Sequence, residues 1–126
     1  MKLLLDSHVF LWWKALDPRL SPAMVRVIAE AEEVNVSAAT AWELGLKVSL
    51  GKLRLPESVE DGIAAAGFTE LPVSFRHTRE AVALPHHHHH DPFDRMLVAQ
   101  ARCEGLTLMT RDDKIIQYEV AVLRVL

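Results

Sequence analysis

The sequence has 126 residues, half of them hydrophobic and a quarter charged, so we expect one globular domain over residues 1–126 with a buried core. Its single cysteine excludes an internal disulfide and is typical of a reducing compartment, which predicts a cytoplasmic location. The net charge of −3 argues against nonspecific wrapping of nucleic acid, and no apolar run reaches the ~18 residues of a membrane-spanning helix.

The N-terminal half alternates short apolar runs with longer helical patterns. Lys2–Leu5 predicts a buried strand rather than a signal peptide, because Asp6 interrupts the apolar stretch and no cleavage site of small residues follows. Ser21 is a good N-cap, with Pro22 at the first helical position. The elements that we expect after the first strand are a helix from about Ser7, a helix from Pro22 to about Glu33, the strand Val34–Ser37 and the helix Ala38–Leu50, which ends at Gly51.

The C-terminal half continues the same alternation. We expect, in order, a helix opened by Pro56 and Glu57 and closed at Gly67, an extended segment Phe68–Val73, a helix capped by Ser74 that ends near Leu84, a helix from Asp91 to Glu104 stopped by Gly105, the strand Leu106–Thr110, a short helical turn Asp113–Tyr118 and a last strand Val120–Val125. Strands that alternate with helices form βαβ units, so the sequence predicts an α/β fold with a mostly parallel central sheet.

Five consecutive histidines, His86–His90, lie between Pro85 and Asp91. A purification tag would sit at a terminus, so we interpret this internal run as a solvated loop between two helices. The alternative is adventitious binding of a transition metal, or a loop over the active site.

Four acidic residues are placed where an α/β sheet binds its ligands. Asp6 and Asp112 directly follow predicted strands, Glu43 lies one turn into the helix after Val34–Ser37, and Asp94 lies in the first turn of its helix. In open α/β sheets, ligands bind beyond the carboxyl ends of the strands. We therefore expect these four carboxylates to converge at one edge of the sheet.

Like charges gathered at one edge repel one another unless a cation holds them. Mg²⁺ or Mn²⁺ fits this role, because these hard cations take carboxylate oxygens and keep waters for a substrate phosphate. Such an ion polarises a phosphoryl group, activates water and stabilises the leaving oxygen. No Cys or His pattern indicates zinc instead.

Two of the acids also have a structural interpretation as helix caps. Asp6 could cap the following helix, although Ser7 could do so too, and we favour a functional role. Asp94 lies three residues after Asp91 and could complete a capping box. We interpret Asp91, immediately before Pro92, as an N-cap rather than a ligand.

The other two acids have alternatives as well. Glu43 could form an ordinary ion pair with Lys47, four residues on, but it is embedded in an apolar stretch where a carboxylate needs a partner. Asp112 and Asp113 are adjacent, and only one can point toward the edge of the sheet. We expect Asp112 in the site and Asp113 as the cap of the next turn.

Four stretches of the sequence carry a family resemblance: Leu3–His8, Ser37–Glu43, His90–Ala101 and Leu108–Asp112. In this order they resemble the successive motifs of PIN domains, and the Asp-Pro-Phe-Asp-Arg…Ala-Gln-Ala stretch closely resembles one branch of VapC-like toxins. The resemblance implies a three-layer α/β/α fold and Mg²⁺-dependent endonucleolytic cleavage of RNA. It further implies that the chain is the toxin of a type II toxin–antitoxin pair, inhibited by a small VapB-type antitoxin.

The resemblance also assigns roles to individual residues. It implies catalytic and metal-binding roles for Asp6, Glu43, Asp94 and Asp112, and a supporting polar role for Thr110. Ser7 stands where the family often has Thr or Asn, and we expect it to support the site as well.

Basic residues near the proposed ligands are candidates for phosphate contacts. Lys47, Arg95 and Arg111 each neighbour a proposed ligand, and phosphate contacts position nucleic acid without reading its sequence. The alternative for each is surface solvation or charge balance for the carboxylates.

Three tryptophans are the remaining notable residues. Trp12 and Trp13 point ~100° apart on a helix, so we expect one in the core and the other half exposed, as an antitoxin or homodimer contact. We expect Trp42, beside Glu43, in the core.

Two other classes of protein compete with the nuclease hypothesis. A receiver-type phosphoacceptor module has a similar length and alternation, but it needs paired acids after the first strand and a lysine after the last interior strand. Here Asp6 is followed by Ser7-His8, and Thr110 is followed by Arg111-Asp112. The second rival is an inactive interaction protein that kept the PIN fold, and four intact acids argue against it.

Overall fold

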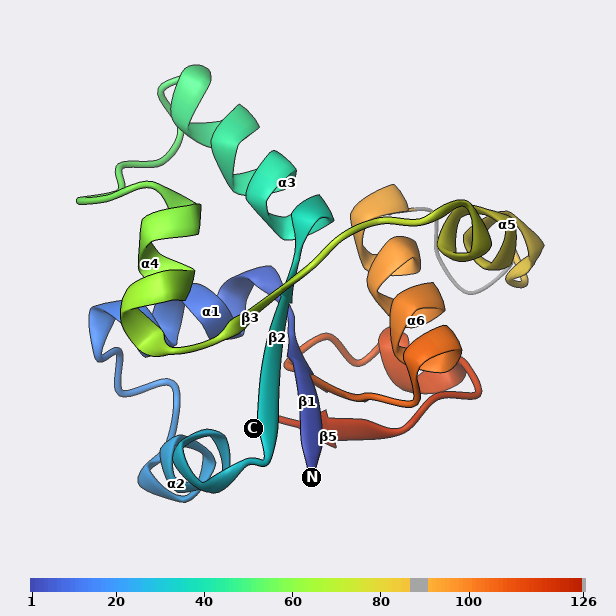
Figure 1. Ribbon diagram of the computed structural model, residues 1–126, viewed down its shortest axis with the longest axis horizontal. Helices are drawn as coiled ribbons and strands as arrows, with labels where there is room; N and C mark the ends of the chain where they lie inside the picture. Colours follow the sequence, from blue (N-terminus) through green and yellow to red (C-terminus); the bar gives the residue numbers. More distant parts are fainter. Residues whose placement is uncertain (87–90, 126) are drawn as a thin grey trace.

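The computed structural model describes residues 1–86 and 91–125, and its centre is a parallel β-sheet (Figure 1). The strands of these residues follow the order β3-β2-β1-β4-β5, and every neighbouring pair is parallel. Their bounds are Lys2–Leu5 for β1, Glu33–Ser37 for β2, Thr69–Leu71 for β3, Thr107–Thr110 for β4 and Val122–Arg124 for β5. Because all strands run the same way, their carboxyl ends meet at one edge of the sheet.

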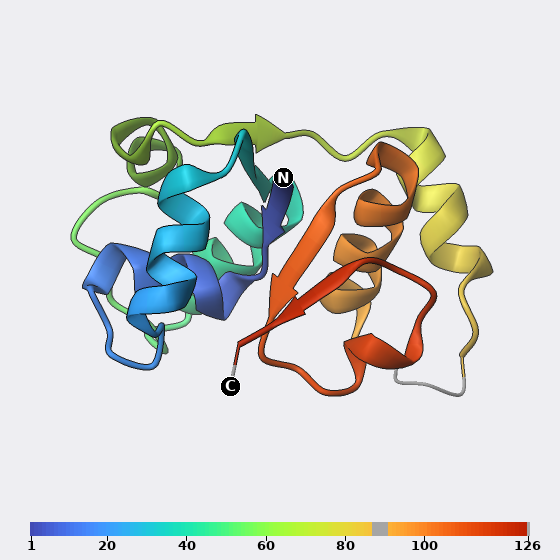
Figure 2. The same cartoon turned by 90° about the horizontal axis from the view of Figure 1, so that it is seen from below.

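Helices cover both faces of this sheet (Figures 1 and 2). On one side lie α1 (Ser7–Ala15), α2 (Pro22–Glu30) and α4 (Val59–Ala66), and on the other lie α5 (Phe75–Ala83), α6 (Pro92–Glu104) and the short 3₁₀ helix η1 (Ile115–Gln117). α3 (Ala38–Ser49) continues directly from the carboxyl end of β2 and contacts both α4 and α6. The expected three-layer α/β/α arrangement is confirmed.

The central strand β1 divides the hydrophobic core in two. Leu3 and Leu5 pack into one cluster together with Val36 of β2, whereas Leu4 packs into the other together with Leu97 of α6. Successive side chains of a strand point to opposite faces, and both faces of this strand are covered. This explains why β1 is a continuous apolar run rather than an alternating one.

Two predicted helix boundaries are wrong by about one turn. α2 ends at Glu30 instead of Glu33, because Glu33 already pairs with Lys2 as the first residue of β2. α4 begins at Val59 instead of Pro56, because the Ser58 side chain accepts a hydrogen bond from the Asp61 N–H and is the N-cap. The other elements agree with the sequence prediction within a few residues at each end.

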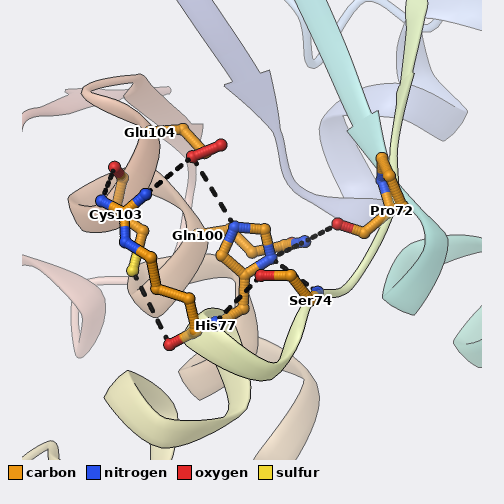
Figure 3. A network of polar contacts seen from close by, with 7 residues as sticks. Pro72, Ser74, His77, Gln100, Cys103 and Glu104 are labelled. Carbon is orange, nitrogen blue, oxygen red and sulfur yellow. Dashed lines mark hydrogen bonds and ion pairs between the residues drawn. The ribbon is translucent and has the colours of Figure 1, made fainter.

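A polar network fastens α5 to α6 (Figure 3). The buried His77 accepts a hydrogen bond from the Ser74 N–H through Nδ1 at 3.0 Å, and its Nε2 lies 3.8 Å from a Glu104 carboxylate oxygen. Gln100 donates to the Pro72 carbonyl at 3.3 Å. These contacts connect α5 to α6 on the side of the sheet opposite α1, α2 and α4.

The tryptophans are only partly where the sequence predicts them. Trp12 is buried and Trp13 is half-buried against Phe68, with ring centres 5.6 Å apart, as expected. Trp42 is 64% exposed and packs edge-on against Phe93, so its prediction as a core residue is wrong. The inward face of α3 is taken by small and aliphatic side chains such as Leu44, and the helical turn places Trp42 outside that face.

Two further predictions concern the surface. In the described ranges 1–86 and 91–125, no helix has the length and apolar character needed to cross a membrane. The predicted loop at the histidine run falls on positions 87–90, which lie outside the described residues, while His86 is exposed.

Candidate active site

A pocket of about 430 Å³ lies at the carboxyl edge of the sheet, where β1 and β4 end. The four acids predicted from the sequence all line it. Among the residues that the structure describes, its lining consists of Asp6, Ser7, His8, Trp12, Arg19, Glu43, Lys47, Asp91, Asp94, Arg111 and Asp112. The parallel sheet therefore brings together residues that are more than a hundred positions apart in the sequence.

Asp6 is held at the end of β1 by the start of α1 and the end of β4. Its Oδ1 accepts a hydrogen bond from the Val9 N–H at 2.8 Å, which makes Asp6 the N-cap of α1. Its Oδ2 accepts a hydrogen bond from the Thr110 hydroxyl at 2.5 Å. Burial raises the pKa of the Asp6 carboxyl above its usual value, although both hydrogen bonds act to lower it. Asp6 is thus a helix cap and a pocket residue at once.

Glu43 reaches the pocket from the second turn of α3. One of its carboxylate oxygens accepts a hydrogen bond from the Ser7 hydroxyl, and the other lies 3.7 Å from the Lys47 ammonium. The predicted ion pair with Lys47 and a place in the pocket therefore coexist. Ser7, which the sequence predicts as a supporting residue, orients this carboxylate.

Asp94 lies in the first turn of α6, close to the other carboxylates. Burial raises its pKa to about 7, and repulsion from Asp91, Asp112, Asp6 and Glu43 adds to the rise. Asp91 caps the helix by accepting from the N–H groups of Phe93 and Asp94 at 2.9 and 3.2 Å. The raised pKa of Asp94 therefore reflects its burial first and the negative charge of the pocket second.

Asp112 follows β4 and is positioned by Thr110, whose hydroxyl oxygen accepts a hydrogen bond from the Asp112 N–H at 3.0 Å. The same hydroxyl donates to Asp6, so Thr110 links the two strand ends. Asp112 Oδ1 accepts from the Lys114 N–H at 2.9 Å and begins the following turn. The prediction that Asp113 caps this turn is wrong, because its carboxylate forms an ion pair with Arg124 of β5.

The donor set of the pocket fits a hard divalent cation, since its acids offer carboxylate oxygens and the lining contains no thiolate. In the described part of the chain, however, no three acidic, histidine or cysteine side chains are already close enough together to form a metal site. Instead, the Asp6 carboxylate accepts from Thr110, and the Glu43 carboxylate accepts from Ser7 and lies beside Lys47. A positive charge that removes their mutual repulsion is what these acids require.

The basic residues near the pocket differ in their roles. Lys47 and Arg111 line it, and their contact with phosphate stays a prediction. Arg19 and His8 also line it, and sequence reasoning missed both because no strand end or motif marks Arg19 and no acid pattern involves His8. The Arg19 and Arg111 guanidinium carbons lie 5.0 and 5.6 Å from the centre of the Trp12 ring.

Arg95 does not lie at the pocket. It is buried against the end of α5, where its guanidinium donates to the carbonyls of Ala81, Leu84 and Pro85 at 3.0, 2.9 and 2.9 Å. One residue along a helix corresponds to a turn of ~100°, so Arg95 faces away from the edge that Asp94 faces. The structure therefore corrects the prediction of Arg95 as a phosphate contact.

Comparison with known proteins agrees with the fold. The PIN domain family model matches residues 3–122, and the chain belongs to the PIN domain family. Among named relatives, it is similar to Ribonuclease VapC22 of Mycobacterium tuberculosis, with 32% identity over 119 residues, which cover 89% of this chain and 88% of that protein. The strand order found here also differs from the 2-1-3-4-5 order of receiver modules, which excludes that rival.

Solved structures share this architecture over nearly the whole chain. A toxin–antitoxin complex from Klebsiella pneumoniae superposes with a TM-score of 0.73 at 17% identity, covering 99% of this chain and 98% of that one. VapBC2 from Rickettsia felis, bound to a DNA fragment from its promoter, superposes with a TM-score of 0.74 at 14% identity, with 98% of each chain covered. FitAcB from Neisseria gonorrhoeae superposes with a TM-score of 0.66 at 23% identity, covering 97% of this chain and 96% of that one. At these identities the likeness establishes the common fold.

Proposed function

We propose that this protein is a metal-dependent endoribonuclease and the toxin of a type II toxin–antitoxin pair. The observation that carries the proposal is the pocket in which Asp94 has a pKa of about 7 among four other carboxylates, at the edge where an α/β sheet binds ligands. The name of the similar Mycobacterium tuberculosis protein, a ribonuclease, supports the reaction. The similar toxin–antitoxin structures support the biological role.

Asp6, Glu43, Asp94 and Asp112 would hold the cation, which we propose to be Mg²⁺, with Mn²⁺ as a substitute. When bound, such an ion supplies Lewis-acid polarisation of the scissile phosphate and stabilises charge on the leaving oxygen. Thr110 and Ser7 hold the carboxylates of Asp6 and Glu43 through their hydroxyls. Because a ligand carboxyl must be deprotonated, binding of the cation would release the proton that Asp94 retains near neutral pH.

An antitoxin partner and a homodimer are parts of the same proposal, and each has a surface that suits it. A groove of about 980 Å³ between α1, α2 and α4 is lined by apolar side chains such as Trp13 and Val25, and we propose that an apolar segment of a VapB-type antitoxin occupies it. Trp42, Leu46 and Leu50 form an exposed stripe along α3 at a spacing of four residues, and we propose that this stripe joins two copies of the chain.

The proposal is tested by purifying the chain and incubating it with RNA in millimolar Mg²⁺ and in chelator. We expect endonucleolytic products only with the metal ion. If the protein acts as a toxin in the cytoplasm, its expression without the proposed antitoxin should arrest cell growth, and co-expression of the antitoxin should relieve the arrest. Soluble wild-type protein that neither cleaves RNA nor slows growth would instead favour an inactive PIN-fold interaction protein.

A further inference from the structure

The pocket contains cationic side chains that its carboxylates do not neutralise. Lys47 lies close to Glu43, but Arg19 donates two hydrogen bonds, at 3.1 and 2.7 Å, to Asp17, which is not part of the pocket lining. Arg111 forms no ion pair with any residue in the ranges 1–86 and 91–125. Arg19 therefore pairs with an acid outside the pocket, and neither arginine balances a carboxylate of the pocket as Lys47 does.

Both arginines lie against one buried aromatic ring. Trp12 is only 5% exposed, and the guanidinium carbons of Arg19 and Arg111 lie 5.0 and 5.6 Å from its ring centre. A cation within ~6 Å of a ring centre is attracted to the ring face. Arg19 comes from the loop after α1, and Arg111 comes from the segment after β4, yet the ring brings their charges to the same pocket. This arrangement limits the freedom of two long side chains before any ligand binds.

We propose that Arg19 and Arg111, positioned by Trp12, form a subsite for the backbone phosphates that flank the scissile bond of a single-stranded RNA. This inference rests on the proposed function. Guanidinium groups match the geometry of phosphate, and a positively charged wall that follows the backbone is typical of single-strand binding. The acids lie within a pocket, which a flexible strand enters more readily than a rigid duplex. Because the contacts are to phosphate, they position the RNA without reading its bases.

The test is a salt titration of RNA binding by the full chain, in chelator, with a labelled single-stranded RNA. Each phosphate contact to a single strand contributes about 0.7 to the slope of log affinity against log salt concentration. Arg19→Gln and Arg111→Gln should each lower the slope by about 0.7, and the double variant by about 1.4, on two RNAs of unrelated sequence alike. Arg79→Gln is the matched control, because Arg79 is an exposed arginine of α5 outside this pocket, and it should leave the slope unchanged.

Trp12 is tested as a positioning residue with two further variants. Trp12→Phe keeps an aromatic ring and should preserve most of the slope, whereas Trp12→Leu should lower it toward that of the double arginine variant. If Trp12→Leu does not fold, the arginine variants decide alone. Unchanged slopes in both arginine variants, an equal fall in Arg79→Gln, or no RNA binding by the wild type would overturn the subsite.

The binding assay separates this inference from the proposed function because it requires no cleavage. A chain that binds RNA with the expected slopes but never cuts it would contradict the nuclease proposal alone. A chain that cuts RNA in Mg²⁺ with slopes unaffected by both arginine substitutions would contradict the subsite alone.

Discussion

At the scale of single residues, the pocket gathers carboxyl groups whose charges oppose one another. The Asp94 carboxyl has a pKa of about 7 in the folded protein, because burial and the neighbouring acids disfavour its ionised form. In the unfolded chain its value returns to 3.8. Between about pH 4 and pH 7 the folded state therefore binds the additional proton, and the free energy of unfolding falls as the pH rises through this range.

Asp94→Asn should remove this pH dependence. In chelator, we expect the wild type to be more stable at about pH 5 than at about pH 8, and we expect the difference in unfolding free energy between the two pH values to shrink in the variant. Urea unfolding of both proteins at both pH values measures it. All other titratable groups are the same in both proteins, so only the difference between the two proteins is diagnostic. An identical pH dependence in the two proteins would mean that the Asp94 carboxyl is not destabilised by its surroundings.

Asp6→Asn tests the metal-binding role of Asp6 against its role as a cap. The asparagine side-chain oxygen can still accept from the Val9 N–H, and the substitution removes a buried charge, so stability in chelator should be unchanged or higher. Millimolar Mn²⁺ should raise the Tm of the wild type and raise that of the variant less, because a ligand is lost. Thermal melts in chelator and in Mn²⁺ measure both effects. Equal shifts in the two proteins would remove Asp6 from the metal site.

The sequence predicts the four acids well because each has a fixed relation to a strand end or a helix start. Asp6 and Asp112 follow strands directly, and a parallel sheet then brings them together. Of the two adjacent acids, Asp112 lines the pocket as predicted, but it also begins the following turn, a role that the sequence had suggested for Asp113. Arg19 is not predictable from a local pattern, because its place depends on the fold of the loop after α1 and on the Trp12 ring.

At the scale of secondary-structure elements, Arg95 ties the end of α5 to the start of α6, beside Asp94. Arg95→Met should destabilise the protein by about 2–3 kcal/mol, because the buried Leu84 carbonyl and the partly buried Ala81 and Pro85 carbonyls lose a charged donor. Arg111→Met is the matched control, since Arg111 is exposed, and it should change stability by no more than about 0.5 kcal/mol. Urea unfolding compares the two. Equally small effects would mean that the guanidinium of Arg95 contributes little to this junction.

Leu16, the C-cap of α1, is a second feature at this scale. It has a left-handed backbone with φ of 54° and is 90% exposed at the groove that we propose for the antitoxin. Leu16→Gly should stabilise the isolated chain by up to about 1 kcal/mol by relieving this conformation, whereas Leu16→Ala should not. Both variants should bind the antitoxin more weakly in calorimetric titrations. Unchanged binding by both variants would move the antitoxin away from this end of the groove.

Element boundaries are predicted where a cap is unambiguous in the sequence. Ser21 with Pro22, and Asp91 with Pro92, mark helix starts that the structure reproduces. The start of α4 differs, because Pro56 is also a good first helical residue and only the hydrogen bond to Ser58 decides between the two positions. Trp42 was misplaced for a related reason, since an apolar stretch does not reveal which side of a helix faces the core.

At the scale of the whole molecule, the alternation of strands and helices predicts a parallel sheet with a ligand edge, and the structure confirms the parallel sheet. The order of the strands is not encoded in any local pattern, because it depends on which apolar runs pair across the chain. The family resemblance predicts the three-layer arrangement but not this order, and the family match over residues 3–122 agrees with the fold class. Once the strands are in this order, Asp6 and Asp112 lie next to each other, because they follow the neighbouring strands β1 and β4.

The most direct test of the central claim compares Asp94→Asn with Asp91→Asn in an RNA cleavage assay. Both residues lie at the start of α6 and line the pocket, but only Asp94 belongs to the proposed metal-binding set, whereas Asp91 is a cap that asparagine can replace. In Mg²⁺, we expect Asp91→Asn to cleave RNA within a few-fold of the wild-type rate. The cleavage rate of Asp94→Asn should be at least about 100-fold lower than that of the wild type. In chelator, none of the three proteins should cleave RNA. Wild-type cleavage that persists in chelator, or Asp94→Asn that cleaves at the wild-type rate, would contradict the account.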